Sequence, residues 1–343
     1  MKSISSFVYA LSLLFAVAVA APNQYVAPSQ GQTRVEWRKL SKASQTDYIS
    51  AVKCLDKLPS KIGLKTSRYN DFPYVHTKLN IQSEYNRLYR HDYAYIASVH
   101  FVAQFLPWHR YFVHLYETAL RDECGYRGSM PYWDWTLDSK DMSKSPVFSK
   151  DKTRGFGGNG LNGGMVSPSR PNPLTMCVLD GAFNNFTVQY YDGASRPHCL
   201  NRGFNDGLNQ AGKFQGDSYS PQTVSKIIDS SRNFNVFATD LENGPHGAIH
   251  QAIGGDLVPS TSPNDPLFFL HHSQIDRLWW IWQQKNPKQR NSDYSGIRIL
   301  ASGVTDKKKA SLKDKLPMFG LGPDKQVSEL MTTSSKLMNY RYE

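Results

Sequence analysis

Two histidines, His246 and His250, are separated by one helical turn. On a helix, residues i and i+4 lie on one face with their Cβ atoms about 6 Å apart, so both imidazoles could bind one metal ion. Such a pair also occurs by chance or in a purely structural role. It therefore indicates a metal site only if further histidines converge on it.

A second pair, His100 and His109, is nine positions apart. One continuous helix would place the two rings on opposite faces, since nine steps of about 100° leave a remainder near 180°. Pro107 lies between them, and a bend at Phe105-Leu106-Pro107 would let His100 point back while His109 projects from the next helix. The alternative for either residue is a histidine packed among the surrounding aromatic side chains.

The adjacent histidines His271 and His272 complete the set. Neighbouring helical residues point about 100° apart, so only one of the two can serve a given site, and periodicity does not choose between them. Asp276 lies four positions after His272 on the same helical face. It could orient that ligand, as carboxylates behind metal-bound histidines do.

The helices that must position these rings can be predicted from apolar spacing and capping signals. In the first half we expect helices over 46–58, over about 80–97, and from Pro107 to about Asp122.

In the second half, Pro245 is predicted to open a short helix that ends at Gly254-Gly255. Asn264-Asp265-Pro266 is a cap and proline start for a helix reaching about Gln284. The segment 139–232 is rich in Gly, Pro, Ser and Asn, which predicts long surface loops with short strands or turns.

Composition limits the class of protein. The 343 residues are 40% hydrophobic and 13% aromatic, enough for a large core. The formal net charge of +11 could indicate a nucleic-acid binder, but the positive charges are scattered apart from Lys307–Lys309. No phosphate-binding glycine loop, nucleophilic-serine elbow or HExxH pattern occurs.

The N-terminal segment has the features of a secretory signal peptide. Lys2 is followed by an apolar run to Val19 and by Ala18-Val19-Ala20, the small-x-small pattern of a cleavage site. We expect a signal peptide over 1–20 and one secreted domain over 21–343. No later apolar stretch reaches the roughly 18–20 residues of a membrane span. The Asn185-Phe186-Thr187 sequon agrees with secretion and makes Asn185 a candidate glycosylation site.

Five segments carry a family resemblance, in order SRYNDFPYVH, HFVAQFLPWHRYFVHLYE, MPYWDW, ENGPHGAIHQAIGGD and SPNDPLFFLHHSQIDRLWWIW. They resemble the two copper-binding regions of the tyrosinase and catechol oxidase family, the type 3 copper proteins, particularly its short secreted fungal members. The resemblance covers about residues 67–282. It implies a mainly α fold, with a four-helix bundle around a dinuclear copper site and long irregular loops at the rim.

The resemblance also implies six copper ligands. His76, His100 and His109 would hold the first ion, and His246, His250 and His272 the second. His91 is an alternative to His76, but the SRYNDF segment favours His76. Independently of the family, six neutral imidazoles without carboxylates favour copper over magnesium, calcium or a carboxylate di-iron centre, although zinc with three histidines remains chemically possible.

The activity implied is oxidation of an o-diphenol, or of an o-aminophenol, with dioxygen reduced to water. The expected partners are dioxygen and a small phenol, without nucleic acid or membrane. Rival functions are a true tyrosinase that also hydroxylates monophenols, an oxygen carrier similar to haemocyanin, and a basic glycan- or wall-binding protein. Secretion as one small domain favours an enzyme.

Two departures from the family pattern follow from the sequence. Many relatives link a cysteine to the second ligand of the first copper, but no cysteine lies between His76 and His109, so we expect no thioether.

Only 61 residues follow Trp282, including the YRY segment at 340–342. This resembles members without a domain that plugs the site, and we expect secretion in active form.

Substrate preference depends on Glu242 and Gly247. In the family, a Glu and an Asn beside the first ligand of the second copper hold a water that accepts the phenol proton. Glu242 matches that Glu and could act as a general base. Gly247 occupies the Asn position without an amide, so we expect diphenol oxidation to exceed monophenol hydroxylation. Alternatively, Gly247 only relieves crowding and backbone groups position the water.

Four cysteines allow three disulfide pairings. We predict Cys54 with Cys124, which lie near the ends of two expected core helices, and Cys177 with Cys199, which bracket a short loop. Closing the second loop would stabilise the fold by about 3 kcal/mol in the chain-entropy model.

Overall fold

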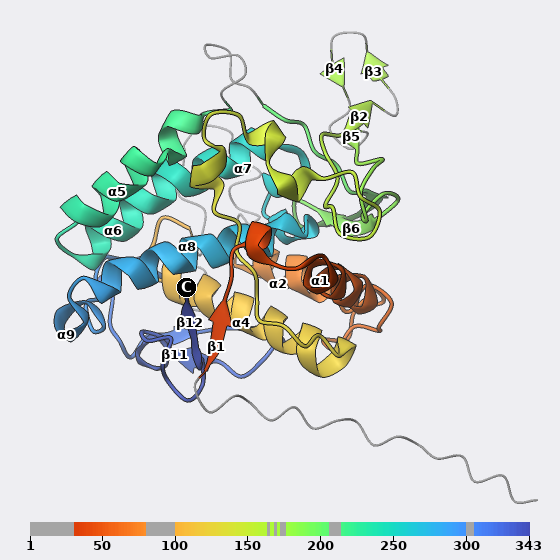
Figure 1. The fold of residues 1–343 in the computed structure, drawn as a ribbon. Helices are drawn as coiled ribbons and strands as arrows, with labels where there is room; N and C mark the ends of the chain where they lie inside the picture. Colours follow the sequence, from red (N-terminus) through yellow and green to blue (C-terminus); the bar gives the residue numbers. More distant parts are fainter. Residues whose placement is uncertain are drawn as a thin grey trace, which may run out of the picture.

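The computed structural model describes residues 31–79, 100–162, 165–167, 170–171, 176–205, 214–299 and 305–343. Within them the fold is mainly α, as predicted (Figure 1). The principal helices are α1 (Lys42–Leu55), α2 (Asp71–Lys78), α4 (Phe105–Cys124), α5 (Pro221–Ser230), α6 (Phe234–Leu241), α7 (Gly247–Ile253), α8 (Leu267–Gln284) and α9 (Pro287–Arg290). The predicted helix over 80–97 lies outside the described residues.

The strands are short and pair two by two. They are β1 (Gln32–Arg34) with β12 (Tyr340–Tyr342), β2 (Leu161–Asn162) with β5 (Met176–Cys177), β3 (Met165–Ser167) with β4 (Arg170–Pro171), β6 (Thr187–Tyr191) with β7 (Ala194–Cys199), β8 (Ile297–Ile299) with β9 (Thr305–Lys309), and β10 (Lys315–Leu316) with β11 (Lys325–Gln326). The parallel pair β1 and β12 brings the C-terminal segment beside the beginning of the described chain (Figure 1).

Helices α4 and α8 form the centre of the core. They pack against each other, and α1 lies against α4 (Figure 1). Residues 267–276 of α8 are all buried, because the helix is covered on every side there. Helix α4 begins at Phe105, with Pro107 in its first turn, and ends at Gly125, whose φ of 69° suits the left-handed C-terminal cap. The bend therefore lies before Phe105, at residues 100–104, and not at Phe105-Leu106-Pro107 as predicted, because those three residues already belong to the helix.

The segment around Pro245 folds differently from the prediction. Pro245 does not open a helix. It lies inside a π-helical turn, η7 (Glu242–His246), that joins α6 to α7. The amide of Gly247 donates to the carbonyl of Glu242, five residues back. The wider turn accommodates a proline, whose ring would clash with the preceding turn of a regular α-helix.

Four of the described helices, α2, α5, α6 and α9, were not predicted from the sequence. The segment 139–232 has the expected short strands, but it ends in the regular helix α5. Ser220 caps α5 through the amide of Thr223, Pro221 occupies its first turn, and Val224 and Ile228 are its buried positions. Helix α2 is short and was not predicted at all. Its burial against the rest of the fold compensates for its marginal length.

The structure confirms both predicted disulfides, Cys54–Cys124 and Cys177–Cys199. The first joins the end of α1 to the end of α4, and the second ties β5 to β7. Across the described part of the chain, no helix combines the length and apolar character that a membrane span needs.

Candidate metal centre

Two groups of histidines converge in the core. His76 of α2, His100 before α4 and His109 of α4 place ligand atoms within 4.8 Å of one another. The second group combines His246, His250, His271 and His272, again within 4.8 Å. The structure thus brings together each predicted trio and adds His271 to the second. His91 lies outside the described residues.

In the first group, His76 and His109 present lone pairs to each other. The Nδ1 of His76 is 2.7 Å from the carbonyl oxygen of Ser260, and the Nδ1 of His109 is 2.8 Å from that of Phe105. Carbonyls only accept, so each neutral ring carries its proton on Nδ1. The Nε2 atoms lie 3.3 Å apart. Two ligands about 2.0 Å from one ion at a tetrahedral angle have this separation, so the pair fits a metal ion.

His100 reaches the same place from outside a helix. Its ring centroid is 5.5 Å from that of His76 and 5.1 Å from that of His109. Its Nδ1 lies 3.1 Å from Oε1 of Glu242, a residue of the π-helical turn. An ionised carboxylate has no proton to donate, so Nδ1 of His100 donates at this contact, and in a neutral ring Nε2 is then available to a metal.

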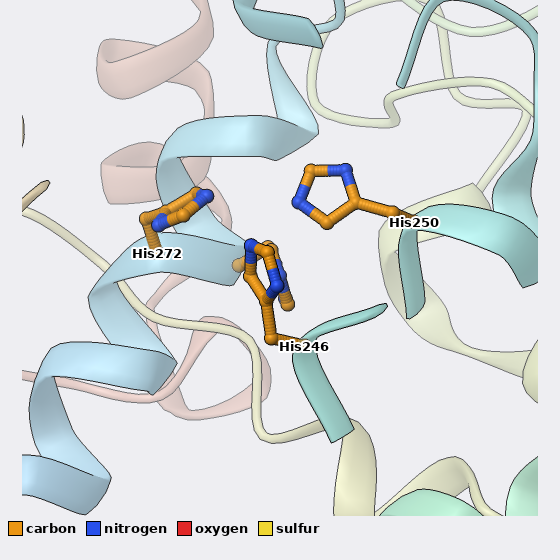
Figure 2. A group of neighbouring side chains, drawn as sticks. His246, His250 and His272 are labelled. Carbon is orange, nitrogen blue, oxygen red and sulfur yellow. The ribbon is translucent and has the colours of Figure 1, made fainter. Parts of the chain in front are cut away.

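The second group is shown in Figure 2, where the rings of His246, His250 and His272 face a common space. The Nδ1 of His250 is 2.5 Å from the carbonyl oxygen of Leu257. The Nε2 atoms of His246 and His250 and both ring nitrogens of His272 are buried without a hydrogen-bond partner. Buried polar atoms normally have one, and a metal ion would satisfy these lone pairs.

The hydrogen bonds separate His271 from His272. The indole N–H of Trp135 donates to Nδ1 of His271 at 3.2 Å. Because Trp is a donor only, the neutral His271 ring carries its own proton on Nε2 and offers no free lone pair. His272 has two unpartnered nitrogens, so it is the better ligand of the adjacent pair.

The site keeps its imidazoles neutral, as ligation requires. Burial, followed by the mutual repulsion of neighbouring imidazoles, holds the pKa of His76, His109, His246 and His272 well below the ordinary 6.5. Burial also lowers the pKa of His250 to about 4.

The two groups face each other directly. The rings of His109 and His272 stack with centroids 4.3 Å apart and an interplanar angle of 12°. His100 and His246 stack at 5.3 Å. This arrangement suits a dinuclear centre rather than two separate sites.

Asp276 does not have the predicted role. Its carboxylate accepts from Arg110 Nε, Arg34 Nη1 and the hydroxyls of Tyr340 and Tyr342, and neither nitrogen of His272 has a hydrogen-bond partner. The two buried arginines and the two tyrosine hydroxyls are the partners of this carboxylate. Asp276 therefore anchors β1 and β12 to the core.

Glu242 and Gly247 lie where the second group meets the first. Glu242 is 4% exposed; burial raises its pKa, and its bonds with His100 and the amide of Phe101 oppose that shift. Gly247 has ordinary helical φ and ψ, and a Cβ there would lie 3.4 Å from the carbonyl oxygen of Glu242. A Cβ added at this position would therefore be in ordinary van der Waals contact with that oxygen.

The sequence analysis missed the groups that orient the rings. Ser260, Phe105 and Leu257 act through carbonyl oxygens, which every residue has, so no side-chain signal marks them. Trp135 was within a quoted segment, but its partner could not be read from spacing.

Comparison with known proteins agrees with this geometry. The family profile described as the common central domain of tyrosinase matches residues 66–285. The chain belongs to the tyrosinase family. It is a copper-dependent oxidoreductase whose cofactor is two copper ions.

Three fungal proteins illustrate the similarity. The tyrosinase-like protein phomQ1' of Diaporthe leptostromiformis is 39% identical, covering 94% of this chain and 82% of its own. The N-acetyl-6-hydroxytryptophan oxidase ivoB of Emericella nidulans is 31% identical, covering 97% and 98%. The solved structure of a polyphenol oxidase from Thermothelomyces thermophila has a TM-score of 0.67 and 28% identity, covering 91% of this chain and 88% of that one.

Proposed function

We propose that the protein oxidises o-diphenols, and also o-aminophenols, to o-quinones or quinone imines. Two substrate molecules each lose two electrons and two protons, and one dioxygen gains four of each to form two water molecules. The copper pair supplies dioxygen binding and electron transfer when it is bound. The observation that carries this proposal is the pair of facing histidine groups, whose ligand nitrogens are buried and whose pKa values favour neutral rings.

The proposed ligands are His76, His100 and His109 for one copper and His246, His250 and His272 for the other. Each assignment is supported by position in a converging group. Carbonyl acceptors behind His76, His109 and His250 fix the tautomer that leaves Nε2 for the metal. His271 is not proposed as a ligand because Trp135 donates to its Nδ1.

Preference for diphenols is supported by two features of the π-helical turn. Gly247 has no side-chain amide to hold a water beside Glu242. In addition, Oε1 of Glu242 already accepts from His100 and from the amide of Phe101. Both features weaken a water-mediated base for monophenols, whereas a catechol is more acidic and depends less on such a base.

Export of the protein is part of the proposal. It is supported by an N-terminal sequence pattern typical of a signal peptide and by two disulfides, which persist in oxidising compartments. Asn185 and Thr187 of the sequon are both exposed, as glycosylation requires. Mass spectrometry of the exported protein should find a mature N-terminus near Ala21 and a glycan on Asn185.

The experiment that tests this function compares initial rates of the copper-loaded protein on catechol, tyrosine, 2-aminophenol and a hydroxyindole. The last is included because one relative is named an N-acetyl-6-hydroxytryptophan oxidase. We expect the highest kcat/KM on the diphenol or the aminophenol. Comparable rates on tyrosine would instead identify a true tyrosinase, and dioxygen binding without turnover would identify an oxygen carrier.

A further inference from the structure

The carboxylate of Glu242 joins the two halves of the metal centre. Glu242 belongs to the π-helical turn that also carries His246. Its Oε1 nevertheless lies 3.1 Å from Nδ1 of His100 and accepts the amide of Phe101 at 2.8 Å. One carboxylate oxygen of Glu242, beside the second histidine group, thus contacts two consecutive residues, His100 and Phe101, at the first group.

His100 needs such an anchor more than the other ligands do. His76, His109 and His250 are helical residues whose Nδ1 atoms meet backbone carbonyls. His100 precedes α4 in a bend, and its side chain is 18% exposed. Its ring is therefore not fixed by a helix, and its orientation depends on contacts such as the one with Glu242.

The backbone beside His100 is also held in an uncommon conformation. Phe101 has a φ of 60°, in the left-handed region that favours glycine, and its side chain is 61% exposed. A non-glycine residue keeps this conformation only where its surroundings fix it. The hydrogen bond from the Phe101 amide to Glu242 is a contact that does so.

We propose that Glu242 is a positioning residue for His100, holding its ring so that Nε2 points toward His76 and His109. Assembly of the first copper site is then coupled to the π-helical turn that carries the second. This inference rests on the ligand set of the proposed function. It assigns Glu242 a role in copper binding that is separate from any role as a base.

The test uses two substitutions of Glu242 that differ in whether the new side chain has a hydrogen-bond acceptor for His100 and Phe101. In Glu242→Gln, the amide oxygen can still accept from His100 and Phe101, although the charge is lost. In Glu242→Met, similar volume is kept without an acceptor. Asp240→Ala is the control, because Asp240 is exposed on the adjoining helix α6. Copper affinity is measured by titrating the metal-free proteins, whose folding is checked by thermal unfolding.

We expect Glu242→Met to weaken one of the two sites by about 10–100-fold, the range seen when groups behind metal-bound histidines are lost. At limiting copper it should retain one ion per chain, with the resonance of a lone Cu²⁺, and we expect the same of His100→Ala. Glu242→Gln and Asp240→Ala should keep two. If Glu242→Met does not fold, Glu242→Asp replaces it, because its shorter side chain withdraws the acceptor from His100.

Two tight sites in the variant without the acceptor would overturn the inference. So would equal weakening of both sites, or a Gln variant as impaired as the Met variant. These outcomes concern copper binding alone. Failure of the proposed function would instead show as a wild-type protein that binds two coppers but does not oxidise catechol.

Discussion

The Nε2 atoms of His76 and His109 lie 3.3 Å apart, and in the neutral rings neither carries a proton, because both Nδ1 atoms donate to carbonyl oxygens. Two facing lone pairs repel each other unless a cation lies between them. The lowered pKa of both rings disfavours a proton in that place. This relationship therefore indicates a metal ion independently of the family match.

The adjacent histidines of α8 should respond differently to substitution. His272→Ala should remove one copper per chain and abolish turnover, because the second ion loses a ligand. His271→Ala should retain two coppers, since its Nδ1 is occupied by Trp135. Metal analysis of both variants checks this, and the ligand choice is wrong if the losses are reversed.

Gly247→Asn should raise monophenol turnover relative to diphenol turnover. The new amide would lie beside Glu242 and could orient a water there, and the Cβ has room. The ratio of the two initial rates is the measurement. Gly247→Ala is the matched control, since it adds the Cβ without the amide. An unchanged ratio in the Asn variant would show that backbone groups already position the water.

Asp276→Asn should destabilise the fold without removing copper. Asp276 neutralises the buried Arg110 and Arg34, and breaking such a network costs about 3–5 kcal/mol. Asp122→Asn, at a side chain that is 54% exposed, should change stability by less than about 0.5 kcal/mol. Denaturant unfolding gives both values. A folded Asp276→Asn protein with one copper would restore the role first expected for this residue.

Stability should depend on pH through His198. Burial of the ring opposes the charged form, but Asp256, 2.9 Å from its Nε2, raises the pKa of His198 above the ordinary 6.5. Because the pKa is raised in the folded state, the contact of protonated His198 with Asp256 makes its full contribution to stability below about pH 6.5. This contribution is lost as pH rises through the raised pKa. The stability difference between wild type and His198→Gln should therefore be largest near pH ~5.5 and shrink toward pH ~8.5. A difference that grows with pH would contradict this assignment.

The sequence predicted the parts of the site that depend on residue type and spacing. The i, i+4 pair His246 and His250 and a bend between His100 and His109 are local properties, and both are present. The choice between His271 and His272 required Trp135, which is 136 residues away in sequence from His271. Long-range contacts of this kind leave no periodic signal.

The error at Asp276 has the same origin. Asp276 shares a helical face with His272, but two distant arginines and two C-terminal tyrosines determine where its carboxylate lies. At Asp276 the local rule fails because these tertiary contacts override it. A proline such as Pro245 usually marks the first turn of a regular helix. Here it lies inside a π-helical turn instead.

The most direct test of the central claim is oxygen uptake by the protein loaded with two coppers per chain, measured together with quinone absorbance during catechol oxidation. We predict one dioxygen consumed for every two quinones formed, and no uptake after copper is removed by a chelator. Quinone formation that continues without copper, or a copper-loaded protein that takes up no oxygen with catechol, would contradict the account.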